Sequence, residues 1–257
     1  MRYTAAPAVY DRWLSAFDQF ANSFSVHAIV SIADVLARPA SYQGAVITLS
    51  GDFLGWSAPA TQTPAIAAPP VTRSDWLMQD KGQTIYVQAG TRLSEDSLSP
   101  DLTGDRDAGK RLRITGIVRL TEKSQPYLEP LAVYPDLAGA WVRRDAESAA
   151  GLALKLTQVN AGLRGQVRLT PAGESGAATD RPVVGRVMEG DKLYLKTTDG
   201  GPSLEIDARL TADGRSFEGT LKSGAGAPET LHMTLGEFAL PGTGADLASR
   251  RDATVRA

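Results

Sequence analysis

Residues 183–221 read VVGRVMEGDKLYLKTTDGGPSLEIDARLTADGRSFEGTL, and this stretch decides the fold class. Apolar residues alternate with polar ones in short runs, as at Leu204, Ile206 and Ala208, with the period of a half-buried β-strand. Turn signals separate the runs, and Asp213-Gly214 is a strong hairpin signal. Short alternating strands joined by tight turns, with no helical pattern between them, predict an antiparallel all-β module.

The same pattern extends over a second module of residues 137–240. Its eight predicted strands lie at Trp141 and at residues 152–156, 163–169, 183–188, 193–196, 204–210, 217–221 and 231–235. Such a series predicts an up-and-down β-barrel or a strongly curved meander, which closes its edges on itself. Gly139-Ala140-Trp141 resembles the Gly-x-Trp start of lipocalin-type barrels, and avidin-like small barrels are an equally good comparison. Trp141 is expected in the barrel core, and no ligand residues are carried over from either family.

A first module, residues 40–136, also has β character. Five strands are predicted at residues 46–54, 75–79, 84–89, 111–120 and 127–134, with a bend at Gly116. Residues 57–71 form a Pro/Ala loop, and residues 94–107 are polar and acidic. This order, with the stretches 42–46, 75–80 and 109–116, resembles a bacterial OB-fold. The resemblance implies a five-stranded OB-like barrel and says little about function, because this fold hosts many unrelated sites.

The two ends of the chain differ from these modules. Residues 1–39 are predicted to be a helical arm with an aromatic stripe formed by Tyr10, Trp13, Leu14, Phe17, Phe20 and Phe24. The stripe either packs on the chain's own β modules or contacts a partner or a second copy. A short helix is predicted at residues 32–38, capped by Ser31 and ended by Pro39. Residues 241–257 are Gly/Ala/Arg-rich and aperiodic, which predicts a disordered tail.

Composition argues against catalysis and cofactor binding. The 257 residues include no cysteine and only two histidines, His27 and His232. Disulfides, thiol nucleophiles, Cys-ligated zinc and a histidine-rich metal site are therefore excluded. Most carboxylates lie in predicted turns, where backbone geometry accounts for them. The sequence predicts a protein that is not an enzyme, with no catalytic residues, no metal site and no cofactor.

Charge bears on nucleic-acid binding, the usual expectation for an OB-fold. The chain has 27 Lys/Arg against 29 Asp/Glu; residues 28–135 have 10 against 11, and residues 136–257 have 15 against 16. Strand-tracking proteins place excess positive charge along their groove, and neither module has an overall excess. One local exception is predicted: Tyr86, Arg111 and Arg113 would share a face if the third and fourth strands are neighbours. That face is either solvated, with a cation–π contact, or a site for an anionic or sugar-like ligand.

Trp56 and Trp76 border the Pro/Ala loop, which often edges the binding face in OB-folds. Each is interpreted either as a lid over the barrel end or as a stacking platform. They complete the predicted ligand-binding set of Trp56, Trp76, Tyr86, Arg111 and Arg113.

The sequence therefore predicts a non-catalytic binding or scaffold protein of bacterial type that engages a partner protein or a small ligand. Single-stranded nucleic-acid binding through Tyr86, Arg111 and Arg113 is the first alternative. A self-assembling structural component, with the aromatic arm as its contact, is the second. No stretch is long and apolar enough for a transmembrane segment. The protein is cytoplasmic if Met1 is the native start, and belongs to the periplasm or cell envelope if a signal peptide was removed.

Overall fold

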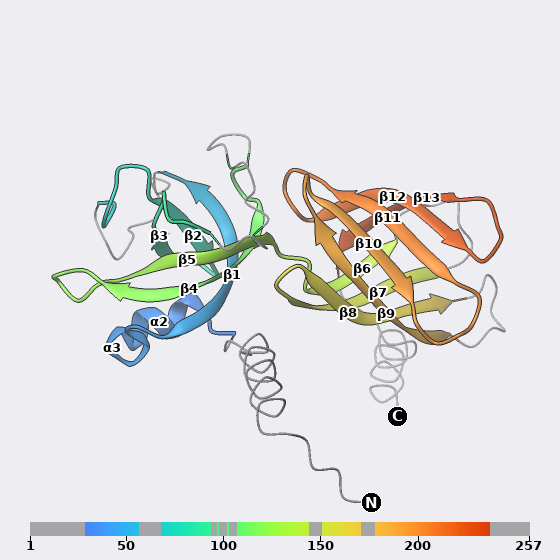
Figure 1. Ribbon diagram of the computed structural model, residues 1–257, viewed down its shortest axis with the longest axis horizontal. Helices are drawn as coiled ribbons and strands as arrows, with labels where there is room; N and C mark the ends of the chain where they lie inside the picture. The colour runs from blue at the N-terminus through green and yellow to red at the C-terminus, as the bar shows by residue number, and fades with distance from the viewer. Residues whose placement is uncertain are drawn as a thin grey trace, which may run out of the picture.

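The computed structural model describes residues 29–56, 68–93, 97, 102, 107–143, 151–170 and 178–236. Two closed β-barrels follow one another along the chain (Figure 1). The predicted fold class is confirmed, since the protein is mainly β, with a five-stranded barrel followed by an eight-stranded one. The predicted aromatic helix, His27 and the predicted tail lie outside the described residues.

Two short helices precede the first barrel, α2 (Ile32–Ala37) and α3 (Pro39–Tyr42). Ser31 caps α2 as predicted, because its hydroxyl accepts a hydrogen bond of 3.0 Å from the N–H of Asp34. Pro39 does not simply end a helix: α2 stops at Ala37, and Pro39 opens α3, where its missing N–H is not needed. The apolar side of α2 is buried in the core of the first barrel.

The first barrel contains all five predicted strands. They are β1 (Val46–Gly55), β2 (Trp76–Asp80), β3 (Gln83–Val87), β4 (Arg111–Leu120) and β5 (Pro126–Pro135). Their order around the barrel is β1-β2-β3-β5-β4, closed by the pairing of β4 with β1. All neighbours are antiparallel except β3 and β5.

Gly116 marks the predicted bend in β4. The register of β4 against β5 shifts between Thr115 and Gly116, as in a β-bulge. A Cβ atom at Gly116 would lie 2.6 Å from the carbonyl oxygen of Glu129, so only glycine permits this close approach.

The second barrel contains all eight predicted strands. They are β6 (Gly139–Arg143), β7 (Gly151–Val159), β8 (Gly162–Thr170), β9 (Thr179–Met188), β10 (Lys192–Thr197), β11 (Leu204–Leu210), β12 (Ser216–Ser223) and β13 (Glu229–Leu235). Each strand pairs with the next, and β13 pairs with β6 to close the wall. The sequence predicted either an up-and-down barrel or a strongly curved meander, and the protein forms the barrel.

The interior of the second barrel is filled by apolar side chains. Trp141 and Phe217 are fully buried, with ring centroids 5.0 Å apart. The Trp141 indole N–H donates a hydrogen bond of 2.9 Å to the carbonyl of Leu137. An eight-stranded barrel is just wide enough for side chains to fill. Trp141 therefore belongs to the core, as predicted.

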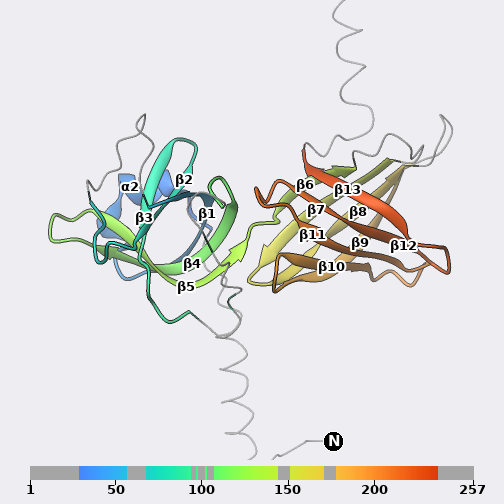
Figure 2. The same ribbon diagram turned by 90° about the horizontal axis from the view of Figure 1, so that it is seen from above.

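A short connection joins the barrels. β5 ends at Pro135 and β6 begins at Gly139, so three residues span the gap. Seen from above, the two barrels lie next to each other along the long axis of the molecule, with this connection between them (Figure 2).

Candidate functional site

The residues predicted to bind a ligand are not gathered at one place. Tyr86 lies on β3 and Arg113 on β4, and β5 runs between these two strands. Tyr86 pairs with Tyr127, whereas Arg113 pairs with Tyr134, seven residues further along β5. At about 3.3 Å per residue, the two positions are roughly 23 Å apart along the strand. The third and fourth strands are therefore not neighbours, and Tyr86 does not share a face with Arg111 and Arg113.

Tyr86 is used in packing on the outer side of the first barrel. It pairs with Leu77 across β2 and β3, with Leu54 and Tyr127 beside them. Only 5% of Tyr86 is exposed, and Leu77 is fully buried. Burial and the negative charge of Asp75 raise the pKa of the Tyr86 hydroxyl. The ring therefore offers no open face on which a base or sugar could stack.

Trp56 and Trp76 meet Phe53 near the end of β1. The ring centroid of Phe53 lies 5.1 Å from that of Trp76 and 6.3 Å from that of Trp56, both edge to face. Trp76 is buried in the barrel core, while Trp56 is 44% exposed and donates a hydrogen bond of 3.1 Å to the carbonyl of Ser74. Trp76 therefore packs as part of the barrel end. A binding role for Trp56 stays a prediction.

Asp75 anchors the loop that precedes β2. Its carboxylate accepts hydrogen bonds of 2.7–3.0 Å from the N–H groups of Val71, Thr72 and Ala89 and from the Thr72 hydroxyl. Burial raises the pKa of Asp75, but the hydrogen bonds, that of Ala89 first, outweigh it and hold the pKa below 3.8. The Asp75 carboxylate therefore links the loop before β2 to the segment that follows β3.

Arg111 and Arg113 face the junction between the barrels. Arg113 Nε donates a hydrogen bond of 3.1 Å to Oδ1 of Asp136, and Arg111 Nε lies 3.3 Å from Oδ2 of the same carboxylate. Arg113 also donates from Nη1 to the carbonyl oxygen of Gln158 in the second barrel, at 2.9 Å. The two guanidinium groups share one carboxylate of the connection, and Arg113 reaches across to the second barrel.

Two further ion pairs cross the junction. Lys110 Nζ lies 2.7 Å from Oδ2 of Asp191, and Arg215 Nη2 lies 2.9 Å from Oδ2 of Asp52. The Gln158 side chain accepts a hydrogen bond from the N–H of Leu137 and donates to the carbonyls of Pro135 and Asn160. We call this set the junction network: Asp52, Lys110, Arg111, Arg113, Asp136, Gln158, Asp191 and Arg215.

The junction network fixes geometry because its buried members need their partners. Lys110, Arg113 and Asp136 are each at most 7% exposed. A buried charge that loses its partner destabilises a protein by several kcal/mol, so these groups favour one arrangement of the two barrels. Charge-assisted hydrogen bonds also constrain direction as well as distance.

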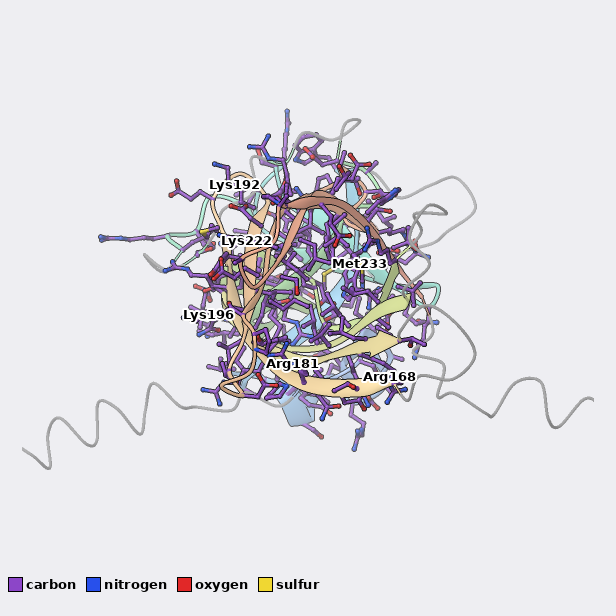
Figure 3. The ribbon with its side chains drawn as sticks, turned by 90° about the vertical axis from the view of Figure 1, so that its right-hand side faces the viewer. Arg168, Arg181, Lys192, Lys196, Lys222 and Met233 are labelled. Atoms are coloured by element: carbon purple, nitrogen blue, oxygen red, sulfur yellow. The ribbon has the colours of Figure 1, made fainter. Side chains whose placement is uncertain are left out.

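The outer surface of the second barrel is divided by charge. Strands β7 to β10 contain seven Lys/Arg and one Asp, a net charge of +6. Strands β11 to β13 and β6 contain three Lys/Arg and four Asp/Glu, a net charge of −1. The turn between β9 and β10 adds Glu189 and Asp191, of which Asp191 is engaged by Lys110. Figure 3, which faces the free end of this barrel, shows Lys192 and Lys196 on one side of the wall and Arg181 and Arg168 along its lower edge.

Five exposed cations of β7 to β10 form what we call the cationic strip: Lys155, Arg164, Arg186, Lys192 and Lys196. The strand register places the first four on successive strands, each two residues away from the position directly opposite its neighbour. Such diagonal neighbours are about 7–8 Å apart. Lys196 of β10 is directly opposite Val184 of β9, which has Arg164 of β8 on its other side, and Lys196 is a diagonal neighbour of Arg186.

The cationic strip differs in its ion pairing from several arginines of the same barrel, although Arg209 and Lys222 also form no ion pair with a described residue. None of its five members forms an ion pair with a described residue. Arg168 and Arg181, on the same strands, each bind one carboxylate through two hydrogen bonds of 2.6 Å, to Asp180 and Asp199. Lys196 faces Glu205 of β11 directly across the sheet, whereas Lys155, Arg164, Arg186 and Lys192 have no acidic residue directly opposite them. This row of four cations is thus not paired within its own barrel.

The cationic strip does not appear in the net charge of whole modules. Residues 136–257 sum to −1, since acids on other strands and beyond them cancel the excess on β7 to β10. A count over outward-facing positions, strand by strand, would have revealed it. The individual residues carry no motif.

His232 lies on the outward side of β13, opposite Glu218 of β12. Within the described part of the chain, no three His, Asp or Glu side chains gather in a group fit to hold a metal ion. The helices described there are all too short or too polar to cross a bilayer. No protein-family model matches the chain, and no curated protein or solved structure matches it.

Proposed function

We propose that this chain is a non-catalytic binding scaffold that holds two β-barrels in one fixed arrangement and engages a partner through their outer surfaces. We further propose that the first barrel is an OB-fold. Its strand order β1-β2-β3-β5-β4, with a long β1 that pairs with both β2 and β4, supports this assignment.

The observation that carries the proposal is the junction network. Two modules on a flexible tether need no buried charges between them, and inter-domain contacts of ordinary proteins permit motion. Here Lys110 and Arg113 of the first barrel are buried against Asp191 and Gln158 of the second. Such contacts favour a scaffold whose two surfaces keep a constant distance and angle.

Both barrel interiors are filled by side chains, so we expect a ligand or partner to bind on the outer surfaces. Buried apolar side chains occupy both cores, with Phe53, Ile114 and Leu128 in the first and Trp141 and Phe217 in the second. Single-stranded nucleic-acid binding through Tyr86, Arg111 and Arg113 receives no support, because the Tyr86 ring is buried and the two arginines are bound to Asp136.

Small-angle X-ray scattering tests the fixed arrangement. We expect the wild-type curve to fit one two-barrel particle, and Arg113→Ala to broaden the distance distribution, because it removes the contacts to Asp136 and Gln158. Arg119→Ala, which removes an exposed pair with Glu129 far from the junction, is the matched control and should leave the curve unchanged. A wild-type curve that requires a wide ensemble of barrel orientations would contradict the proposal.

A screen of hydrolase and transferase substrates tests the non-catalytic part. Robust turnover that disappears when a single carboxylate is replaced would overturn it.

A further inference from the structure

We propose that the cationic strip of the second barrel is a docking surface for a short, extended, acidic segment of a partner protein. The inference rests on the proposed function, because it names the partner of the binding scaffold. Its members are Lys155, Arg164, Arg186, Lys192 and Lys196.

Ion pairing within the barrel does not explain the cationic strip. Like charges on neighbouring strands repel one another and do not stabilise a sheet. Arg143, Arg168 and Arg181 of this barrel are paired with Glu229, Asp180 and Asp199, whereas Arg209 and Lys222 form no ion pair with a described residue. Lys196 has Glu205 directly opposite it, but Lys155, Arg164, Arg186 and Lys192 have no carboxylate opposite them and form no ion pair with a described residue. A ligand outside the chain is therefore the natural source of negative charge for this row.

The spacing of the cations matches that of alternate side chains in an extended peptide. Lys155, Arg164, Arg186 and Lys192 follow one another diagonally, one per strand, at steps of about 7–8 Å. In an extended peptide, alternate side chains on one face recur every 6.6–6.8 Å or so. Four acidic residues at alternate positions therefore match four cations across the wall, and Lys196 lies on β10 four residues from Lys192.

The scarcity of aromatic side chains around the strip favours an acidic peptide over a nucleic acid as its ligand. Proteins that bind single strands interleave aromatic platforms with their cations. On the outer face of β7 to β10, Tyr194 is the sole aromatic side chain in the described residues, and it is half-buried. The whole chain has a net charge of −2. A polyanion longer than the strip would therefore extend over surface that has acidic side chains and be repelled there. A short segment stays within one screening length of the strip.

Fluorescence anisotropy of the full chain with a labelled peptide tests the proposal. The probe is a nine-residue peptide with Glu at alternate positions and Thr between them, and the same peptide with Gln in place of Glu is its control. We expect saturable binding of the Glu peptide at low salt, weakening at least tenfold at 0.3 M salt. The Gln peptide should not bind.

Variants locate the site. Arg164→Glu combined with Arg186→Glu should weaken binding of the Glu peptide at least tenfold. Lys123→Glu reverses an exposed cation in the turn between β4 and β5 of the first barrel, away from the strip, and should change the affinity less than twofold. All three positions are exposed, so circular dichroism should show unchanged folding.

Three outcomes would overturn the proposal. They are no binding of the Glu peptide at low salt, an equal loss in Lys123→Glu, or tighter binding of an oligothymidine of equal charge, which would assign the strip to nucleic acid. None of these outcomes alters the scattering test of the fixed barrels, so failure of the strip and failure of the scaffold are distinguishable.

Discussion

The Nζ atom of Lys110 lies 2.7 Å from Oδ2 of Asp191, and this contact joins the residue before β4 of the first barrel to the turn between β9 and β10 of the second. The Lys110 side chain is 4% exposed and that of Asp191 is 28% exposed. The pair is therefore asymmetric, with a buried cation held by a carboxylate that water also reaches. Its energetics should be asymmetric as well.

Asp191→Asn should destabilise the protein more than Lys110→Met. The first leaves a buried ammonium without its carboxylate, at a cost of about 2–3 kcal/mol, whereas the second removes the buried charge and keeps most of the apolar stem, at about 1 kcal/mol. A double-mutant cycle by urea denaturation should give a coupling above about 1 kcal/mol. The exposed pair Arg119–Glu129 is the control, with an expected coupling below that value. Simple additivity at Lys110 and Asp191 would refute the role given to this pair.

Asp75→Asn should destabilise the first barrel by about 2 kcal/mol at neutral pH, because the charged acceptor of the Val71, Thr72 and Ala89 hydrogen bonds is lost. The folded-state pKa lies below the unfolded value of 3.8, so this stabilisation is complete above pH 3.8 and is lost as pH falls through the folded-state pKa. Denaturation from pH 7 downward should show the gap between the two proteins closing below pH 3.8. A gap that stays constant into strong acid would contradict this account.

Arg181→Gln should raise the pKa of Asp199. Hydrogen bonds from the Arg181 guanidinium, at 2.6 Å each, lower that pKa from 3.8 to about 2, against the opposing effect of burial. Carbon-13 NMR titration of the carboxyl groups should find it near 2 in the wild type and closer to 3.8 in the variant. Asp180, which Arg168 holds at a lowered pKa in the same way, is the internal control and should not move. An Asp199 pKa indifferent to Arg181 would disprove the assigned cause.

Gly185→Ala should destabilise the second barrel by about 3 kcal/mol. A Cβ atom at this position would overlap the carbonyl oxygen of Tyr194 on β10 and press on the Leu195 side chain, so the backbone of β9 would have to move. Thermal unfolding checks the effect. Thr220→Ala, at an exposed position of β12, is the control and should stay within about 0.5 kcal/mol of the wild type. A similar stability of both variants would show that β9 and β10 are less closely packed than described.

The strands could be predicted from the sequence because their signals are local. Alternation such as Leu204, Ile206 and Ala208, with Asp213-Gly214 as the following turn, fixes a strand and a hairpin within a few residues. Closure of the second barrel was not decided by such signals, because the pairing of β13 with β6 joins residues about ninety positions apart.

The junction could not be predicted because its residues resemble ordinary surface residues. Asp191 and Arg215 lie in turns, where polar residues are common for backbone reasons. Arg111 and Arg113 alternate with Leu112 and Ile114, so their outward direction was predicted correctly, but the sequence does not say that the second barrel lies there. Alternation of polar and apolar residues along one strand is the same whether the polar face meets solvent, a ligand or another barrel.

Residual dipolar couplings of the full chain test the fixed arrangement of the barrels most directly. If the junction network holds them as one unit, backbone N–H couplings from β1 to β5 and from β6 to β13 will fit a single alignment tensor with the orientation of Figure 1. Separate tensors of different magnitude for the two barrels would contradict it, since they would mean that the barrels reorient independently.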